Sequence, residues 1–171
     1  MNCVKSKIES TLGLPFELIE IDKSGERFVF AFKCFDDDQS DYSIKKGGVT
    51  GKFEISYRGH GIDSGFLCDL TVGNVHQFYL DLDNAYNIQL GKHTKVTLQD
   101  YSKERSLLSF SFDKLGHCFV SGCFKNKDYG CRNGICFEEI EIDQTEIPRM
   151  LSAMKKLFNE LERIQGHSDF Y

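Results

Sequence analysis

Apolar and polar side chains alternate through the first part of the chain with the two-residue period of a β-strand that has one buried face. The clearest run places apolar side chains at four alternate positions, Phe28, Phe30, Phe32 and Cys34. Ser24-Gly25 precedes this run, where a tight turn would join two strands of a hairpin. Residues 15–35 are therefore predicted to be β-structure folded as a hairpin.

A second alternation, over residues 53–57, predicts a strand with one face in water. Glycine-containing segments at 59–61 and 64–65 are expected to bound the turn that follows, before a further short strand at 66–70. Two more alternating runs come later in the chain, at residues 96–98 and 108–112.

The last two predicted strands differ from these in their patterns. Residues 117–124 are apolar on both faces, which predicts a central strand covered on both sides. In the final strand, within 130–143, Phe137 is out of phase with Ile140. This change of phase predicts a β-bulge near Glu138.

The apolar period changes to the three-to-four spacing of a helix at two places. The first predicted helix covers residues 73–86, with Asn74 as its N-cap, and its apolar face comprises Val75, Phe78, Tyr79, Leu82 and Tyr86. The second covers residues 145–165, with Thr145 as its cap and Gly166 as its stop.

Together these elements predict a single α+β domain over residues 1–171, because a chain of this length forms about one domain. Its architecture is predicted as a mostly antiparallel, twisted sheet or half-barrel. The mid-chain helix and the long C-terminal helix pack on it, since each must bury an apolar face. The first twelve residues are expected to form a short helix or a frayed start.

Composition narrows the class of protein. A hydrophobic content of 40% is too high for a disordered chain, and 21 basic against 26 acidic residues argues against binding nucleic acid. The N-terminal segment lacks the apolar core of a signal peptide, and no run approaches the roughly 18 apolar residues of a membrane-spanning helix. Seven cysteines, an odd number, favour reduced thiols in a cytoplasm.

Two pairs of residues could support catalysis. Asp63 lies three positions after His60 and could orient its ring as a base, and Glu139 and Glu141 share a strand face at about 7 Å. Each pair also has a commoner interpretation, as a local hydrogen bond in a turn and as a solvated strand face that discourages edge pairing. His117 is expected to donate to a carbonyl of a neighbouring strand.

Four cysteines are close in sequence, with the spacing Cys118-x4-Cys123-x7-Cys131-x4-Cys136. Structural zinc sites usually need pairs two to four residues apart on a tight knuckle. A separation of five positions in a strand places two side chains on opposite faces. The cysteines are therefore interpreted as buried thiols, and neither a metal nor a cofactor is predicted.

An acidic run is the remaining distinctive feature, and it consists of Asp36, Asp37, Asp38 and Asp41. It is interpreted as a solvated loop or as a negative patch that docks a basic partner, because complementary charge accelerates encounter. Tyrosines combine a large apolar face with a polar tip, so four of them are candidate anchors of such an interface: Tyr42, Tyr57, Tyr101 and Tyr129.

From about residue 50 to residue 165 the chain resembles the WapI-type immunity proteins of contact-dependent polymorphic toxin systems. The resemblance lies in an ordered series of features: the half-buried strand 53–57, Asp69-Leu70-Thr71 before a helix, Gly116-His117 at a strand start, and Asp143-Gln144-Thr145 at the entry to a long helix. The cysteines and the acidic run are not part of it.

The resemblance implies a small, non-catalytic cytoplasmic protein that binds a cognate toxin domain and covers its active site or substrate surface. Toxins of such systems are often nucleases, and the acidic balance of this chain suits a basic nuclease. Two alternatives remain open. One is a small-ligand binding module with a phenylalanine-lined cavity between sheet and helix. The other is an enzyme that uses one of the two residue pairs described above.

Overall fold

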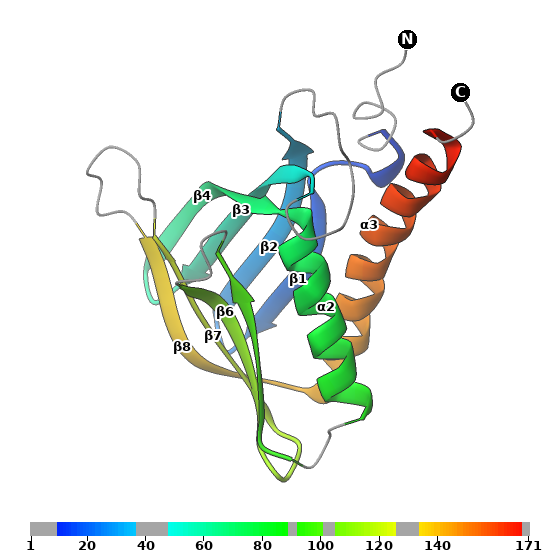
Figure 1. Ribbon diagram of the computed structural model, residues 1–171. Coiled ribbons are helices and arrows are strands. Elements are labelled where there is room, and N and C mark those ends of the chain that lie inside the picture. The colour runs from blue at the N-terminus through cyan, green and yellow to red at the C-terminus, as the bar shows by residue number, and fades with distance from the viewer. Residues whose placement is uncertain (1–9, 37–47, 89–91, 101–104, 126–133, 169–171) are drawn as a thin grey trace.

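The computed structural model describes residues 10–36, 48–88, 92–100, 105–125 and 134–168. These residues form two four-stranded antiparallel sheets that face each other, with two long helices along one side (Figure 1). The first sheet has the order β1 (Phe16–Lys23), β2 (Glu26–Phe35), β3 (Thr50–Gly59), β4 (Ile62–Thr71). The second has the order β5 (Thr94–Gln99), β6 (Ser106–Phe112), β7 (Cys118–Lys125), β8 (Gly134–Ile142).

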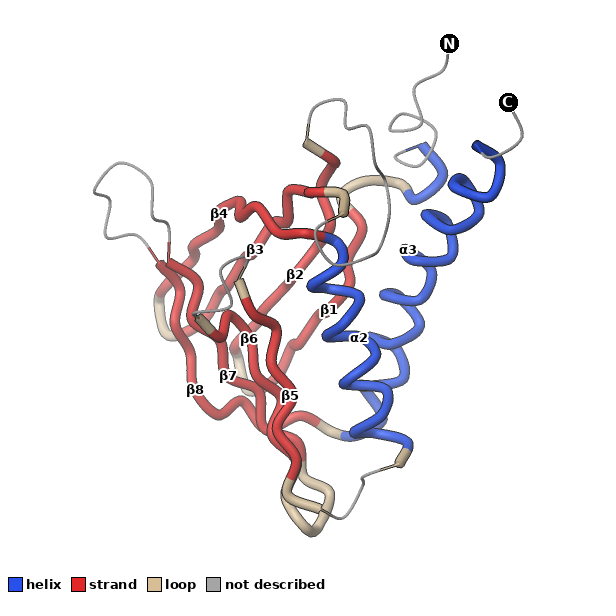
Figure 2. Tube along the Cα trace, in the orientation of Figure 1, coloured by secondary structure: helices blue, strands red, loops and turns tan. Residues whose placement is uncertain are grey.

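The helices are α2 (Val72–Asn87) and α3 (Ile147–Ser168), and a short 3-10 turn, η2 (Gln144–Glu146), precedes α3 (Figure 2). The predicted α+β class is confirmed, with two antiparallel sheets where the sequence suggested one. Residues 10–12 are helical, and the first nine residues lie outside the described part.

Two-residue turns with positive φ connect the strands of the first sheet in pairs. Ser24 and Gly25 have φ values of 55° and 83°, and His60 and Gly61 have values of 49° and 76°. Such turns match the right-handed twist of the strands they join. The first hairpin is confirmed, but Ser64-Gly65 lies inside β4 rather than at a turn, because β4 pairs continuously with β3.

Aromatic side chains fill the space between the two sheets. The Phe28 ring of β2 lies 5.9 Å from that of Phe124 in β7 and 4.8 Å from that of Phe137 in β8. The Phe66 ring of β4 lies 6.3 Å from that of Phe124. Burying one such side chain contributes about 1.5–3 kcal/mol to stability. The buried residues of both sheets and both helices form one hydrophobic cluster.

Helix α2 packs against the second sheet, where its Phe78 ring lies 5.7 Å from that of Phe110 in β6. The predicted helix is confirmed, but its predicted cap is wrong. Thr71 is the N-cap, and its Oγ1 accepts a hydrogen bond from the Asn74 amide at 3.2 Å. The hydroxyl thereby satisfies one of the amides that the first helical turn leaves without an intrahelical partner.

Helix α3 lies beside β1 and α2. Its predicted cap, Thr145, is replaced by Asp143, whose carboxylate accepts from the Thr145 amide at 2.8 Å and so starts the 3-10 turn. The helix continues past Gly166 to Ser168. On the β1 side, the Arg149 guanidinium donates to the backbone carbonyl of Glu20 at 3.0 Å.

Strand β7 is central in its sheet, as predicted, but only one of its faces is fully buried. The face toward the core is buried and includes Cys118, Val120 and Phe124. The outer face is half-buried and includes Phe119, Ser121 and Cys123. The predicted bulge is confirmed, because the register moves from Val120↔Ile140 to Gly122↔Phe137.

The packing of α2 on α3 generates a prediction about pH. The His76 ring lies 4.7 Å from that of Phe158, and this burial lowers the pKa of His76 below 6.5 even though Glu162 attracts the charged form. The unfolded chain therefore binds a proton at a higher pH than the folded chain. Stability should fall as the pH is lowered from about 7.5 to about 5.

Urea unfolding midpoints across this range measure the effect. A His76→Gln variant should lose part of the pH dependence, whereas His93→Gln, which changes an exposed histidine, should keep it. An unchanged slope in the His76→Gln variant would contradict the assignment.

Candidate functional site

Only two members of the predicted partner-binding set lie in the described residues, Asp36 and Tyr57. The others lie outside them: Asp37, Asp38, Asp41, Tyr42, Tyr101 and Tyr129. Asp36 directly follows β2, and its amide donates to the Thr50 carbonyl at 3.1 Å. Its carboxylate lies 3.8 Å from the Lys52 ammonium group, so the start of the acidic run is paired with a neighbouring base.

Tyr57 belongs to the core and is only 7% exposed. Its ring stacks on that of Phe137 with centroids 5.8 Å apart, and its hydroxyl donates to Glu26. Burial, the hydrogen bond to Glu26 and the charge of Glu26 raise the pKa of Tyr57 to about 12. The expectation that this ring anchors a partner at the surface is wrong, because its position in β3 points it between the two sheets.

His60 and Asp63 do not form the predicted pair. The His60 Nε2 atom lies 3.2 Å from Glu26, while Asp63 forms an ion pair with Arg58 at 3.0 Å. Glu26 therefore faces both the buried Tyr57 hydroxyl and an exposed imidazole. A Cβ atom at Gly59 would lie 2.8 Å from the Tyr57 hydroxyl, so this glycine leaves the space that the contact needs.

The second predicted pair lies on the edge strand β8. Glu139 and Glu141 are both exposed, and Glu139 is at the bulge with a φ of 54°. Its amide donates to the Ser121 hydroxyl at 3.2 Å. The positive φ removes Glu139 from the regular alternation of the strand, on which the predicted shared face depended.

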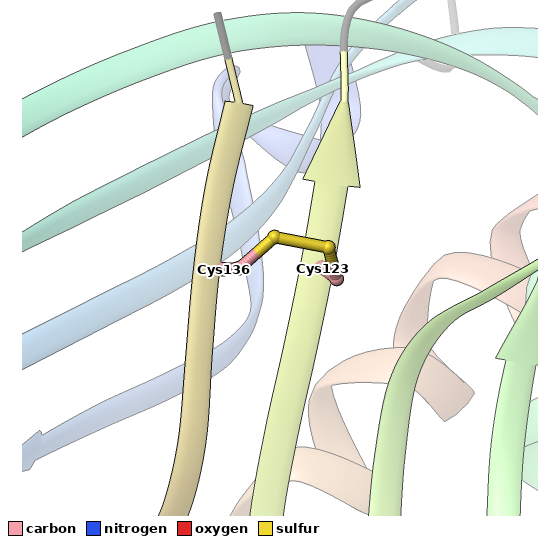
Figure 3. Close-up of a disulfide and its surroundings, with 2 residues drawn as sticks. All are labelled: Cys123 and Cys136. Carbon is pink, nitrogen blue, oxygen red and sulfur yellow. A yellow bond between two sulfur atoms is a disulfide. The ribbon is translucent and has the colours of Figure 1, made fainter.

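Cys123 of β7 and Cys136 of β8 form a disulfide, with Cα atoms 4.0 Å apart (Figure 3). The prediction that all cysteines are reduced is wrong for this pair. The two residues are thirteen positions apart, but antiparallel pairing places them directly opposite each other. Cys136 is exposed and Cys123 is half-buried, so the bond lies on the outer face of the sheet.

Cys34, Cys68 and Cys118 are free thiols. Burial raises the pKa of Cys118 to about 12, and burial together with the charge of Asp69 raises that of Cys68 to about 12. Both thiols therefore stay protonated at neutral pH and are poor nucleophiles. Among the described residues, no group of three or more potential ligands could hold a metal ion.

His117 contacts Asp113 rather than a strand carbonyl, with Nδ1 and Oδ2 3.0 Å apart. The Asp113 carboxylate also accepts from the amides of Leu115 and His117. Desolvation by itself would raise the pKa of Asp113, but these hydrogen bonds outweigh it and lower the pKa. The pair thus stabilises the β6–β7 turn.

A surface that was not predicted from the sequence lies along β4, at one edge of the first sheet. Because the two-residue turn makes Gly59 and Ile62 a hydrogen-bonded pair, the alternation of the ladder directs every second backbone group of β4 away from β3. We call these residues the open edge: Asp63, Gly65, Leu67 and Asp69.

The open edge combines apolar and acidic side chains. Leu67 is 49% exposed, and Ile62 next to the turn is 56% exposed. Asp63 is paired with Arg58, whereas Asp69 forms no ion pair with any described residue. The alternation of β4 predicted which side chains share a face, but it could not show that no strand among the described residues lies beside them.

We compared the chain with known proteins, and no family model, no curated protein and no solved structure matches it. In the described part of the chain, none of the helices has both the length and the apolar character needed to cross a membrane.

The Tyr57–Glu26 contact can be tested by deleting the hydroxyl. Tyr57→Phe should lower the free energy of unfolding by about 1–2 kcal/mol, because Glu26 loses a buried donor while the stacked ring remains. Tyr86→Phe is the matched control, since Tyr86 is half-buried in α2 and its hydroxyl contacts no described hydrogen-bonding partner. Equal unfolding midpoints of the two variants in urea would contradict the role of this hydrogen bond.

The disulfide closes a loop of about fourteen residues, so its loss should cost about 3 kcal/mol through unfolded-chain entropy. Cys123→Ser should therefore be less stable than the unmodified protein in oxidising buffer and equally stable in excess reductant. Cys34→Ser, a control at a free thiol, keeps the disulfide, so excess reductant should destabilise it as much as the unmodified protein. A Cys123→Ser variant that matches the unmodified protein under both conditions would show that the bond is absent in solution.

Proposed function

We propose that this chain is a non-catalytic immunity protein that binds a cognate toxin domain and covers its working surface. The observation that carries the proposal is the open edge, where exposed Leu67 lies between acidic side chains on a strand that has no neighbour beyond β3 in the described part of the chain. Edge strands with apolar side chains are usually protected, so a long exposed one is a recognition surface or an aggregation hazard.

The sequence resemblance also supports an immunity function. The features that carry it belong to β3, to the residues before α2, to the start of β7 and to the entry to α3. Four of the groups with displaced pKa values have structural explanations: Tyr57 and Cys118 are buried, and Asp113 and Asp143 accept hydrogen bonds in turns.

The partner is proposed to be a basic domain such as a nuclease. A net charge of −5 favours approach to a positively charged surface that itself binds phosphate groups. A stable complex would bury roughly 1,200–2,000 Å² in total. Its site of action is proposed to be the cytoplasm, where most disulfides are reduced, so binding should not require the Cys123–Cys136 bond.

Co-expression with the toxin domain encoded beside this gene tests the proposal. Cells should grow when both are present and stop when the toxin is expressed alone, and the two proteins should co-purify at a ratio of one to one. Cys123→Ser should protect as well as the unmodified chain. Neither protection nor a complex would refute the proposed function, and protection without a complex would refute occlusion as its mechanism.

A further inference from the structure

The four edges of the two sheets are not equivalent. Helix α3 covers the β1 edge, where Arg149 binds the Glu20 carbonyl, and α2 contacts the β5 edge. The bulge at Glu139 interrupts β8, and bulges prevent an edge from accepting another strand. Strand β4 differs from all three, because its ten residues pair with β3 without any irregularity and no described element covers its other side.

The inner face of β4 is also incompletely covered. Phe66 and Cys68 point toward the second sheet but are only half-buried, whereas Phe53 and Ile55 at the corresponding positions of β3 are fully buried. A further strand beside β4 would cover these side chains and Leu67 on the opposite face. It would also satisfy the backbone groups of the open edge.

We infer that the open edge of β4 binds an extended, basic segment of the partner as a fifth strand of the first sheet. This inference rests on the proposed function in so far as the segment belongs to the toxin domain. The acidic residues of the open edge, Asp63 and Asp69, are six positions apart on one face, so they match two basic residues six positions apart in the segment. On the β3 side they already lie opposite Arg58 and Lys52, so each carboxylate would be shared between two bases.

The residues between them define the rest of the motif. The segment needs an apolar residue opposite Leu67 and a bulky one opposite Gly65, because an aromatic side chain covers a strand glycine well. The recognised pattern is therefore basic, apolar, aromatic and basic at alternate positions.

A second copy of the chain fits the open edge less well. Strand β4 contains two aspartates and no lysine or arginine, so self-pairing in any register forms no opposite-charge pair. Pairing centred on Phe66 places Asp63 opposite Asp69 twice, and like charges directly opposite each other are destabilising. Charge thus favours a basic partner over dimerisation through β4.

The probe is a synthetic peptide of seven residues with the sequence lysine, serine, leucine, valine, tyrosine, serine, lysine. It is titrated into the isotopically labelled full-length chain and followed by the amide signals. The signals of Asp63, Gly65, Leu67 and Asp69 should shift most. The same peptide N-methylated at its third and fifth residues should not bind, because it loses the donors that pair with β4.

Two charge variants complete the test. Reversing both acids, Asp63→Lys with Asp69→Lys, should weaken peptide binding about tenfold or more. Glu141→Lys makes one such charge change on the β8 edge and should leave binding unchanged. Thermal unfolding of each variant verifies its fold, and the N-methylated peptide tests the inference on the unmodified chain.

The outcomes separate the inference from the proposed function. Shifts away from β4, equal binding of the N-methylated peptide, or concentration-dependent dimerisation through β4 would overturn the inference. If the toxin complex forms and is unaffected by the double charge reversal, the inference fails while the immunity function stands. If the peptide binds at β4 but no toxin complex forms, the immunity function fails while the binding surface stands.

Discussion

Contact between aromatic rings of the two sheets holds this fold together. Phe28 lies at its centre, because its ring touches both Phe124 and Phe137 of the opposing sheet. Phe137 in turn stacks on Tyr57, whose hydroxyl is bound to Glu26. A continuous series of contacts therefore runs from the middle of the core to the turn end of the first sheet, and the positions of Glu26 and His60 depend on it.

The same packing explains why β4 differs from its neighbours. The second sheet covers β2 and β3 with rings from β7 and β8, and the Phe66 ring of β4 contacts that of Phe124. The helices lie beside β1 and β5, and α2 contacts β4 where that strand runs into the helix (Figure 1). An edge that is regular in its ladder yet incompletely covered on its inner face follows directly from this arrangement.

Features that depend on local periodicity could be predicted from the sequence. Alternation located the hairpin around Ser24-Gly25, the three-to-four spacing located both helices, and the change of phase before Ile140 located the bulge. Each of these features arises within one or two neighbouring elements, so the relevant residues are close together in the chain.

Features that depend on contacts between distant segments could not be predicted in this way. The Cys123–Cys136 bond requires the register of β7 on β8, and the partner of His60 lies on another hairpin. The cap of α2 is Thr71 rather than Asn74 because β4 runs directly into the helix, which no periodicity indicates. The open edge was missed because a pattern identifies the faces of a strand but not its neighbours.

The position of Arg149 has a consequence for stoichiometry. Its guanidinium binds a carbonyl that a strand on the far side of β1 would need, and α3 lies beside that strand, so on our inference the first sheet can be extended at β4 and not at β1. A molecule built in this way can accept a single added strand and then offers no continuation to the next. The association would end at a discrete pair and would not propagate into a fibre.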